Sequence, residues 1–324
     1  MQFLFFSIHD SRFFGSCQKY AIIGYQKTTK GLVQGFKESF SYLEIIERIG
    51  YFAVFGGFTD LQSLHRYEDL RENIHHNILE RYAEFASLFR FSDDRALQQD
   101  LETLLFRIAV GDRKSHSIYK NDISQPRGRE LYKILYAQKV ITREYSREQP
   151  LPKVPGRFLK KEMRRYRIED KILFVKNFTR FWFTFILPHK EDIARGDFRA
   201  VTAQIDRELD KYISFTFENL SNLLIQQKFT DEIVTESGSY WDREIEIDLL
   251  AKTASGKVIA GECKWKNQRI SKNILNKLEK KCEVGKLKVD YYALFSKSGF
   301  SNELRKKRPD NLLLFESRDF ESLL

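Results

Sequence analysis

The spacing of hydrophobic residues in the last third of the chain changes from a helical to an alternating pattern and back. From 203 to 227, apolar side chains recur every three or four positions, as on one face of an amphipathic helix. From 244 to 265 they alternate with polar ones, which is the period of a strand, and Ala254-Ser255-Gly256 can close a hairpin. The pattern predicts, in order, a helix over 203–227, a short strand at Ile233-Val234, a hairpin with strands over 244–252 and 257–265, a Lys-rich helix over 270–284, and strands over 289–295 and 312–315.

Alternation along the hairpin assigns its residues to two faces. In the first strand, the apolar face would carry Ile245, Ile247, Leu249 and Ala251, and the other face Glu246, Asp248, Leu250 and Lys252. In the return strand, one face would carry Val258, Ala260, Glu262 and Lys264. Cys263 then points to the opposite face, as a small buried hydrophobe. We therefore expect Asp248, Glu262 and Lys264 to converge across the hairpin.

Residues 68–145 contain a second region of helical spacing. It predicts a helix over 68–91, a helix capped by Ser92-Asp93-Asp94, a helix from Pro126 to about Gln138, and a strand over 140–145. This order is typical of a winged helix-turn-helix, whose second helix enters a DNA groove. A plain helical bundle with a solvated basic face fits the same pattern equally well.

Breaks in the pattern suggest where the chain divides. Pro150, Pro152 and Pro155 cluster beside Gly156 and indicate a loop or a domain boundary. Residues 1–60 are hard to interpret, apart from a turn at Gly56-Gly57. We expect an undefined segment over 1–67, a helical, winged-helix-like domain over 68–200, and a mixed sheet flanked by helices over 203–324. The predicted fold class is α+β or α/β.

Composition and charge then narrow the class of partner. The 324 residues include 55 Lys and Arg against 45 Asp and Glu, a net charge of +10, and the 42% hydrophobic fraction excludes a largely disordered chain. Residues 101–202 carry +11, residues 203–250 carry −7 and residues 251–310 carry +10. The segment from Lys153 to Arg180 contains ten basic residues and three acidic ones. This distribution favours a polyanionic partner.

The cysteine content and the apolar runs of the sequence indicate in which cellular compartment the protein is expected and whether it crosses a membrane. The three cysteines form no Cys-x-x-Cys motif, so reduced thiols in a cytoplasmic protein are the simplest interpretation. The apolar start lacks the basic region of a signal peptide. The apolar run Ile172–Leu187 contains Lys176 and Arg180 and falls short of the roughly 20 residues of a membrane span. We expect buried structure there, with Phe181-Trp182-Phe183 in a core, and no contact with a membrane.

The candidate chemistry lies in the hairpin. Two converging carboxylates, Asp248 and Glu262, form a hard-oxygen site suited to Mg²⁺ or Mn²⁺, and Lys264 beside them could neutralise charge on a phosphoryl group. Glu-x-Lys recurs at Glu169/Lys171 and Glu279/Lys281, but without a hairpin partner that bears Asp. The alternative is a surface ion-pair network on a hairpin. Glu246 shares the face of Asp248 and could be a carboxylate that supports the site, but we rather expect it to be an exposed partner of Lys252.

The arrangement resembles the PD-(D/E)XK nuclease superfamily and, more closely, the C-terminal domain of archaeal-type AAA+ ATPases. The resemblance rests on Phe55-Gly56-Gly57, Tyr166–Asp170, Phe181-Trp182, Phe217-Glu218-Asn219-Leu220, Trp241-Asp242-Arg243, Glu246-Ile247-Asp248 and Gly261–Trp265. It implies a restriction-endonuclease-like sheet preceded by a winged helix, and a metal site formed by Glu218, Asp248 and Glu262, with Asp248, Glu262 and Lys264 as catalytic residues. No Gly-x-x-x-x-Gly-Lys-Ser/Thr motif occurs in the chain, so ATP is not an expected cofactor.

These observations predict a DNA-binding protein with a Mg²⁺-dependent deoxyribonuclease site. The residues expected to contact nucleic acid are Arg127, Arg129, Lys133, Lys160, Lys161, Arg164, Arg165, Lys277 and Lys280. The lysines of the 270–284 helix, including Lys281, could equally form a solvated face. The alternative is a catalytically silent DNA-binding or assembly module, as a partner of a separate P-loop ATPase or as a homo-oligomer. A third interpretation is a protein-interaction domain without a nucleic-acid role.

Overall fold

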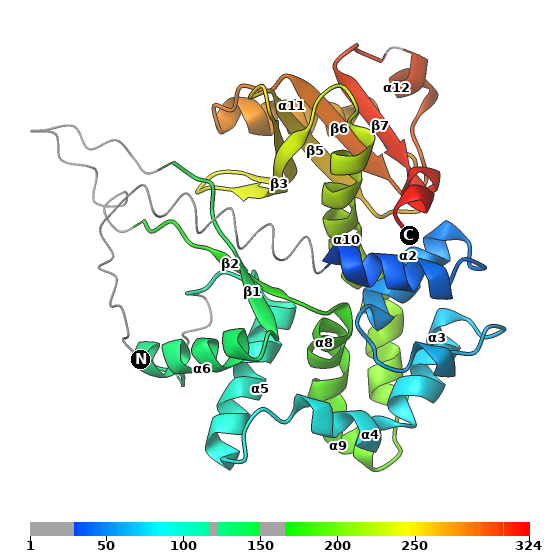
Figure 1. Ribbon diagram of the computed structural model, residues 1–324, viewed down its shortest axis with the longest axis vertical. Helices are drawn as coiled ribbons and strands as arrows, with labels where there is room; N and C mark the ends of the chain where they lie inside the picture. Colours follow the sequence, from blue (N-terminus) through cyan, green and yellow to red (C-terminus); the bar gives the residue numbers. More distant parts are fainter. Residues whose placement is uncertain (1–28, 117–121, 150–165, 307) are drawn as a thin grey trace, which may run out of the picture.

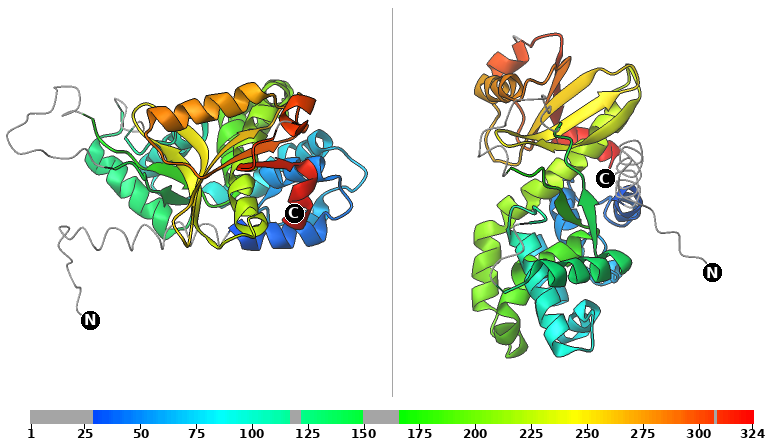
Figure 2. Two further views of the ribbon diagram at one scale, coloured as in Figure 1. Left: turned by 90° about the horizontal axis from the view of Figure 1, so that it is seen from above. Right: turned by 90° about the vertical axis from the view of Figure 1, so that its left-hand side faces the viewer.

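A five-stranded sheet and a two-stranded sheet, connected by a helical region, form this α+β protein (Figure 1). The computed structural model describes residues 29–116, 122–149, 166–306 and 308–324. The large sheet lies at one end of the molecule and most of the shorter helices at the other (Figure 2). The long helix α10 (Arg199–Lys228) connects the two ends, because it contacts α2 (Ile45–Phe55) as well as three strands of the large sheet.

The large sheet has the strand order β3-β4-β5-β6-β7. Its strands are β3 (Val234–Trp241), β4 (Glu246–Thr253), β5 (Val258–Lys264), β6 (Tyr291–Ser296) and β7 (Leu312–Glu316). The first three are antiparallel neighbours, whereas β5, β6 and β7 are parallel and are connected through α11 (Lys272–Val284) and α12 (Asn302–Lys306). The predicted order of helix, strand, hairpin, helix, strand and strand is confirmed, although β3 is longer than expected.

The predicted division of the first hairpin strand into two faces is wrong in one respect. Ile245 and Ile247 lie in the core that α11 covers, whereas Leu249 and Ala251 lie in the core that α10 covers. The physical reason is a shift of register between β3 and β4, which occurs between the pairs Gly238–Leu250 and Tyr240–Ile247. An extra residue in one strand reverses the faces beyond it, and Asp248 lies at this irregularity.

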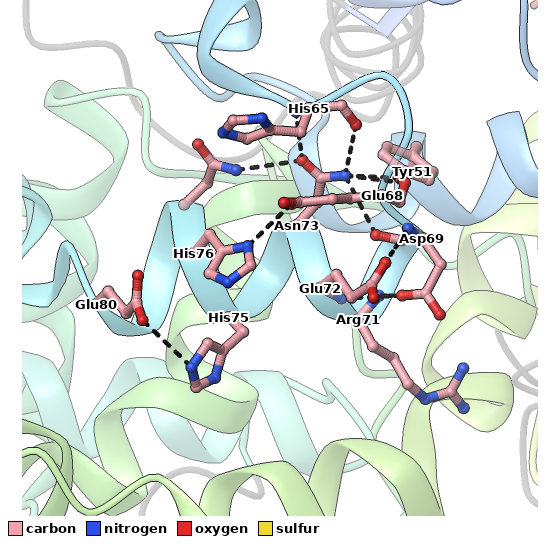
Figure 3. A network of polar contacts seen from close by, with 11 residues as sticks. Tyr51, His65, Glu68, Asp69, Arg71, Glu72, Asn73, His75, His76 and Glu80 are labelled. Carbon is pink, nitrogen blue, oxygen red and sulfur yellow. Dashed lines mark hydrogen bonds and ion pairs between the residues drawn. The ribbon is translucent and has the colours of Figure 1, made fainter.

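The region predicted as one helix over 68–91 is broken into four short helical segments. They are α3 (Leu70–Ile74), a π-helical turn (His75–Leu79), α4 (Tyr82–Ala86) and a 3₁₀ turn (Ser87–Phe89). Asp69 caps α3 in a capping box with Glu72, and the buried Asn73 donates to the backbone that precedes the helix (Figure 3). Within this region, the rings of Tyr82 and Phe89 stack on Trp182. The region is therefore helical, as the spacing predicts, but it is not one regular α-helix.

The predicted elements that follow are confirmed. Asp94 caps α5 (Arg95–Val110), and α6 (Gln125–Ala137) begins with Ser124 as its cap and Pro126 in its first turn. Strands β1 (Ile141–Glu144) and β2 (Lys171–Phe174) form an antiparallel pair, and a single bridge adds Lys114 beside Lys171. The segment that connects β1 to β2 includes residues 150–165, so the expected loop at Pro150–Pro155 lies outside the described residues.

The apolar run after β2 is buried, as expected. It forms α8 (Asn177–Phe181), a π-helical turn (Trp182–Ile186) and a 3₁₀ turn (Leu187–His189), followed by α9 (Lys190–Ala194). Phe181, Trp182 and Phe183 lie in a hydrophobic core that extends to both ends of α10. In the ranges that the structure describes, no helix combines the length and the apolar character needed to cross a membrane.

Candidate functional site

The candidate site lies where β4 and β5 separate. The two strands are paired from Lys252 and Val258 to Leu249 and Gly261, and beyond that point β5 continues with β6 alone. There, Oδ2 of Asp248 accepts a 2.8 Å hydrogen bond from the backbone N–H of Cys263, in place of a partner in the strand ladder. Asp248 is therefore held in the gap between the strands by the same backbone that carries Glu262 and Lys264.

Glu262 lies at the centre of this gap and is 8% exposed. Its Oε1 is 2.7 Å from Nζ of Lys264, and its Oε2 is 2.9 Å from Nζ of Lys281 on α11. The structure thus brings Glu262 and Lys264 together, as predicted. A buried carboxylate with two lysine partners satisfies the requirement that a buried charge be paired.

Lys281 is the site residue that the sequence reasoning assigned to a different role. It was grouped with the exposed lysines of its helix, but it forms an ion pair with Glu262. Its position beside the buried Cys282 and three residues after the buried Leu278 is the signal that could have identified it. That spacing places Lys281 at the inner edge of an amphipathic helix.

Burial and like charges alter the acidity of two of the carboxyl groups. Burial, followed by the charge of Glu262, raises the pKa of Asp248 to about 6, against the hydrogen bond from Cys263 and the charge of Lys264. Burial, followed by the charge of Asp248, raises the pKa of Glu218 to about 7, against the opposing charge of Arg113. These shifts show that carboxyl groups from α10, β4 and β5 share one electrostatic environment.

Glu218 reaches this environment because α10 is fixed to the sheet one turn later. Asn222 donates a 3.2 Å hydrogen bond to the backbone oxygen of Asp248 and accepts one of 2.7 Å from the hydroxyl of Ser237. Glu218 and Asp248 line the same pocket. Within the described ranges, however, no hydrogen bond connects the Glu218 carboxylate to Asp248, Glu262 or Lys264. Glu218 is therefore a neighbour of the cluster formed by Asp248, Glu262 and Lys264.

The donor set can be tested against the metal that it was expected to hold. Among the described residues, no group of three or more His, Cys, Asp or Glu side chains is arranged to hold a metal ion. Mg²⁺ is usually held by one or two carboxylates together with water and substrate phosphate oxygens. Asp248 and Glu262 meet this smaller requirement chemically, and Glu262 would then share its oxygens with Lys264 and Lys281.

The expected pairing of Glu246 with Lys252 is wrong. Oε1 of Glu246 is 2.5 Å from Nζ of Lys171, a residue of β2 that is only 2% exposed. The same ammonium group lies 4.4 Å from the ring centroid of Trp241. The physical reason is that the β1–β2 hairpin packs against this end of the large sheet. Lys171 belongs to the Glu169/Lys171 pair, which lacks a hairpin partner that bears Asp. Its contacts with Glu246 and Trp241 join β2 to the large sheet.

The residues predicted to contact nucleic acid fall into three groups. Arg127 connects α6 to α5 through an ion pair with Asp100 at 2.7 Å, and it pairs with Glu130 of its own helix at 2.8 Å. Exposed positions are occupied by Arg129 and Lys133 on α6, and by Lys277 and Lys280 on α11. Lys160, Lys161, Arg164 and Arg165 lie outside the described residues.

Comparison with known proteins gives one match. A family model described as archaea bacterial proteins of unknown function matches residues 182–279, which include Glu218, Asp248, Glu262 and Lys264. No curated protein matches the chain, and no solved structure does. Residues 182–279 are thus similar to a family of archaeal and bacterial proteins of unknown function, which is consistent with the resemblance to the C-terminal domain of archaeal-type ATPases.

Proposed function

We propose that this protein is a metal-dependent deoxyribonuclease with a site of the PD-(D/E)XK type. The observation that carries the proposal is the convergence of Asp248, Glu262 and Lys264 where β4 and β5 separate. The order α10-β3-β4-β5-α11-β6 supports it, because it is the order of core elements that the resemblance implies. A carboxylate pair with an adjacent lysine is suited to the hydrolysis of a phosphodiester.

Each residue has a distinct part in this proposal. Asp248 and Glu262 would hold Mg²⁺, with Glu218 as a neighbouring carboxylate, and the bound ion would polarise the phosphodiester and lower the pKa of a water molecule. Lys264, held 2.7 Å from Glu262, would place its ammonium group beside the charge that develops on the phosphoryl oxygens. The hydrogen bond from Cys263 fixes the orientation of the Asp248 carboxylate before a substrate binds.

DNA is the proposed substrate because basic side chains are exposed on α6 and on α11, and α11 also contributes Lys281 to the site. Arg129 and Lys133 are exposed on α6, which precedes the β1–β2 hairpin in the order of a winged helix. On α11, Lys277 and Lys280 are exposed on the helix whose Lys281 reaches the site. Contacts with phosphates would make binding depend strongly on salt concentration.

The proposal is tested by cleavage of single-stranded, duplex and branched DNA in Mg²⁺, in Mn²⁺ and in EDTA. Wild-type protein should cut at least one substrate in the presence of metal, and Asp248→Asn and Lys264→Ala should each abolish cleavage. Lys252→Ala is the matched control, because Lys252 is exposed on β4 at the far end of the strand from Asp248. The proposal is wrong if wild-type protein cuts none of these substrates, or if both variants cut as well as wild type.

A second candidate function is supported by the ion pairs of Glu262. Both of its oxygens face lysines in this structure, and such a neutralised carboxylate is also expected in a catalytically silent module. Such a module would bind DNA, or assemble with a separate ATPase, without cutting DNA. Equal DNA binding with and without Mg²⁺, together with no cleavage of any substrate, would favour this alternative.

A further inference from the structure

A pocket of about 50 Å³ lies between the β1–β2 hairpin and the large sheet. Its lining includes Glu218 and Asp248 from the candidate site, together with Arg113, Tyr145 and Asn219. A buried water molecule needs roughly 10–15 Å³ of such space, so the pocket has room for about four waters. A single phosphate group is of this size, whereas a whole nucleoside is much larger.

Three hydrogen-bond donors in this pocket remain uncommitted. In the ranges that the structure describes, no hydrogen bond or ion pair engages the guanidinium of Arg113, the amide of Asn219 or the hydroxyl of Tyr145. A cation, an amide and a phenol around one small cavity form a set of donors that suits a ligand with several acceptor oxygens.

The charged residues that the segment 143–147 contributes to the pocket wall already have partners. Arg147 donates to the backbone oxygens of Gly238, Ser239 and Leu250, at 2.6 to 2.8 Å. Glu144 accepts from the backbone and the hydroxyl of Ser239, and Arg143 lies 3.6 Å from Asp170. These contacts fix the hairpin against β3. Among the described arginines that line the pocket, Arg113 is then the one whose guanidinium has no oxygen partner.

Arg113 is held in place by its backbone and by an aromatic ring. Its φ angle of 63° lies in the left-handed region, which residues with a side chain rarely adopt. Its carbonyl accepts a 2.8 Å hydrogen bond from Ile172, and its guanidinium lies 4.1 Å from the ring centroid of Phe215. Phe215 precedes Glu218 by three residues on α10. The strained backbone and the ring together direct the Arg113 side chain toward the pocket.

We propose that this pocket binds one phosphate of a DNA strand next to the phosphate hydrolysed at Asp248, with Arg113 as its charged ligand. Asn219 and Tyr145 supply the neutral donors. The inference rests on the proposed nuclease function and adds that the helical part of the chain contributes directly to the site. Arg113 is a positioning residue, because it binds the strand beside the reacting phosphate.

The test uses Arg113→Asn in the full chain. Asparagine tolerates the left-handed conformation, so this variant should fold as well as wild type, which its thermal unfolding will show. The experiment measures binding of a fluorescent single-stranded oligonucleotide in EDTA over a series of salt concentrations. The variant should bind several-fold more weakly, and the slope of log K against log salt should fall by about 0.7, the value for one phosphate contact. Arg113→Lys, which keeps the charge, should retain the slope.

A matched control and a competitor complete the design. Arg199→Asn removes an exposed arginine from the first turn of α10 and should leave both affinity and slope unchanged. Inorganic phosphate, if it occupies the pocket, should compete with the oligonucleotide on wild-type protein and not on Arg113→Asn. Binding by Arg113→Asn that equals wild type in affinity and slope would overturn the inference.

The outcome also separates this inference from the proposed function. If wild-type protein cleaves DNA and Arg113→Asn cleaves it with an unchanged KM, the phosphate pocket is refuted and the nuclease function stands. If wild-type protein never cleaves, but the slope of log K against log salt in EDTA is smaller by about 0.7 for the variant, the nuclease function is refuted and the phosphate pocket stands.

Discussion

Two clusters of lysine and glutamate, one on each side of Asp248, differ in which partner is buried. In the first, Lys171 is 2% exposed and its partner Glu246 has a side chain that is 59% exposed. In the second, the side chain of Glu262 is 11% exposed, whereas the side chains of Lys264 and Lys281 are 26% and 34% exposed. In the first cluster the carboxylate of Glu246 is exposed to solvent. In the second, the ammonium groups of Lys264 and Lys281 are the more exposed partners.

This difference distinguishes a structural contact from a candidate site. Lys171 fills a buried position against the ring of Trp241, so its contribution is mainly to packing. Glu262 pairs with two partly exposed ammonium groups, each of which has three hydrogens and so retains donors for a further partner. The same pair of residue types is therefore buried in opposite ways, and we expect the direction of burial to distinguish a packing contact from the proposed site.

The largest expected effect compares the two carboxylates. Glu262→Gln should reduce cleavage of DNA by about 10²- to 10³-fold, because it removes one metal-binding carboxylate and releases both lysines. Glu246→Gln is the matched control and should leave the cleavage rate within a factor of about two of wild type, since Glu246 pairs with Lys171 of β2 and not with Glu262 or Lys264. Initial rates at saturating Mg²⁺ measure both. Equal losses in the two variants would show that the two clusters do not differ in function.

The next effect concerns the free energy of unfolding. Here the larger loss is expected in the cluster of Lys171 and Glu246, and the smaller loss in the cluster of Glu262. Lys171→Ala should lower the free energy of unfolding by about 2 kcal/mol, because it empties a buried position and removes a cation–π contact. Lys281→Ala should lower it by less than about 1 kcal/mol, because the lysine is partly exposed and Lys264 still pairs with Glu262. Urea denaturation of the two variants measures the difference. A larger loss in Lys281→Ala would contradict the distinction between packing and site.

The smallest effect concerns a third pair, at the turn of the hairpin. Glu232 forms an ion pair with Lys257, and this pairing, with help from Ser255 and Thr253, lowers the pKa of Glu232 from 4.5 to about 2. A lowered pKa adds stability that is complete above the ordinary value and is lost as the pH falls through the folded value. The unfolding temperature of wild type should therefore exceed that of Glu232→Gln at pH 6 and approach it near pH 2. A difference that does not depend on pH would refute this.

Local pattern was sufficient to predict most of the elements that support the site. Helix α10, the β4–β5 hairpin, α11 and the two following strands have hydrophobic spacing that tertiary contacts do not override. The convergence of Glu262 and Lys264 also follows from the period of a strand, since two residues apart on β5 share a face. These features depend on neighbours in the sequence, which explains why they could be predicted.

The features that escaped prediction depend on distant segments. The shift of register beside Asp248 is determined by how β3 pairs with β4, and the sequence of β4 alone carries no sign of it. The partner of Glu246 comes from β2, 75 residues away along the chain. The π-helical turn His75–Leu79 interrupts the regular helix that the spacing predicts, and Arg113 lines a pocket together with residues of α10 and β4 that are distant in the sequence.

In the proposed nuclease, Asp248 and Lys264 act as one catalytic unit, and a double-mutant cycle can test this. The experiment compares the Mg²⁺-dependent cleavage rates of wild type, Asp248→Asn, Lys264→Ala and the double variant. If the two residues serve the same step, each single variant loses activity to nearly the same residual rate, and the double variant is no slower. Losses that multiply in the double variant, or single variants that retain the wild-type rate, would contradict the account.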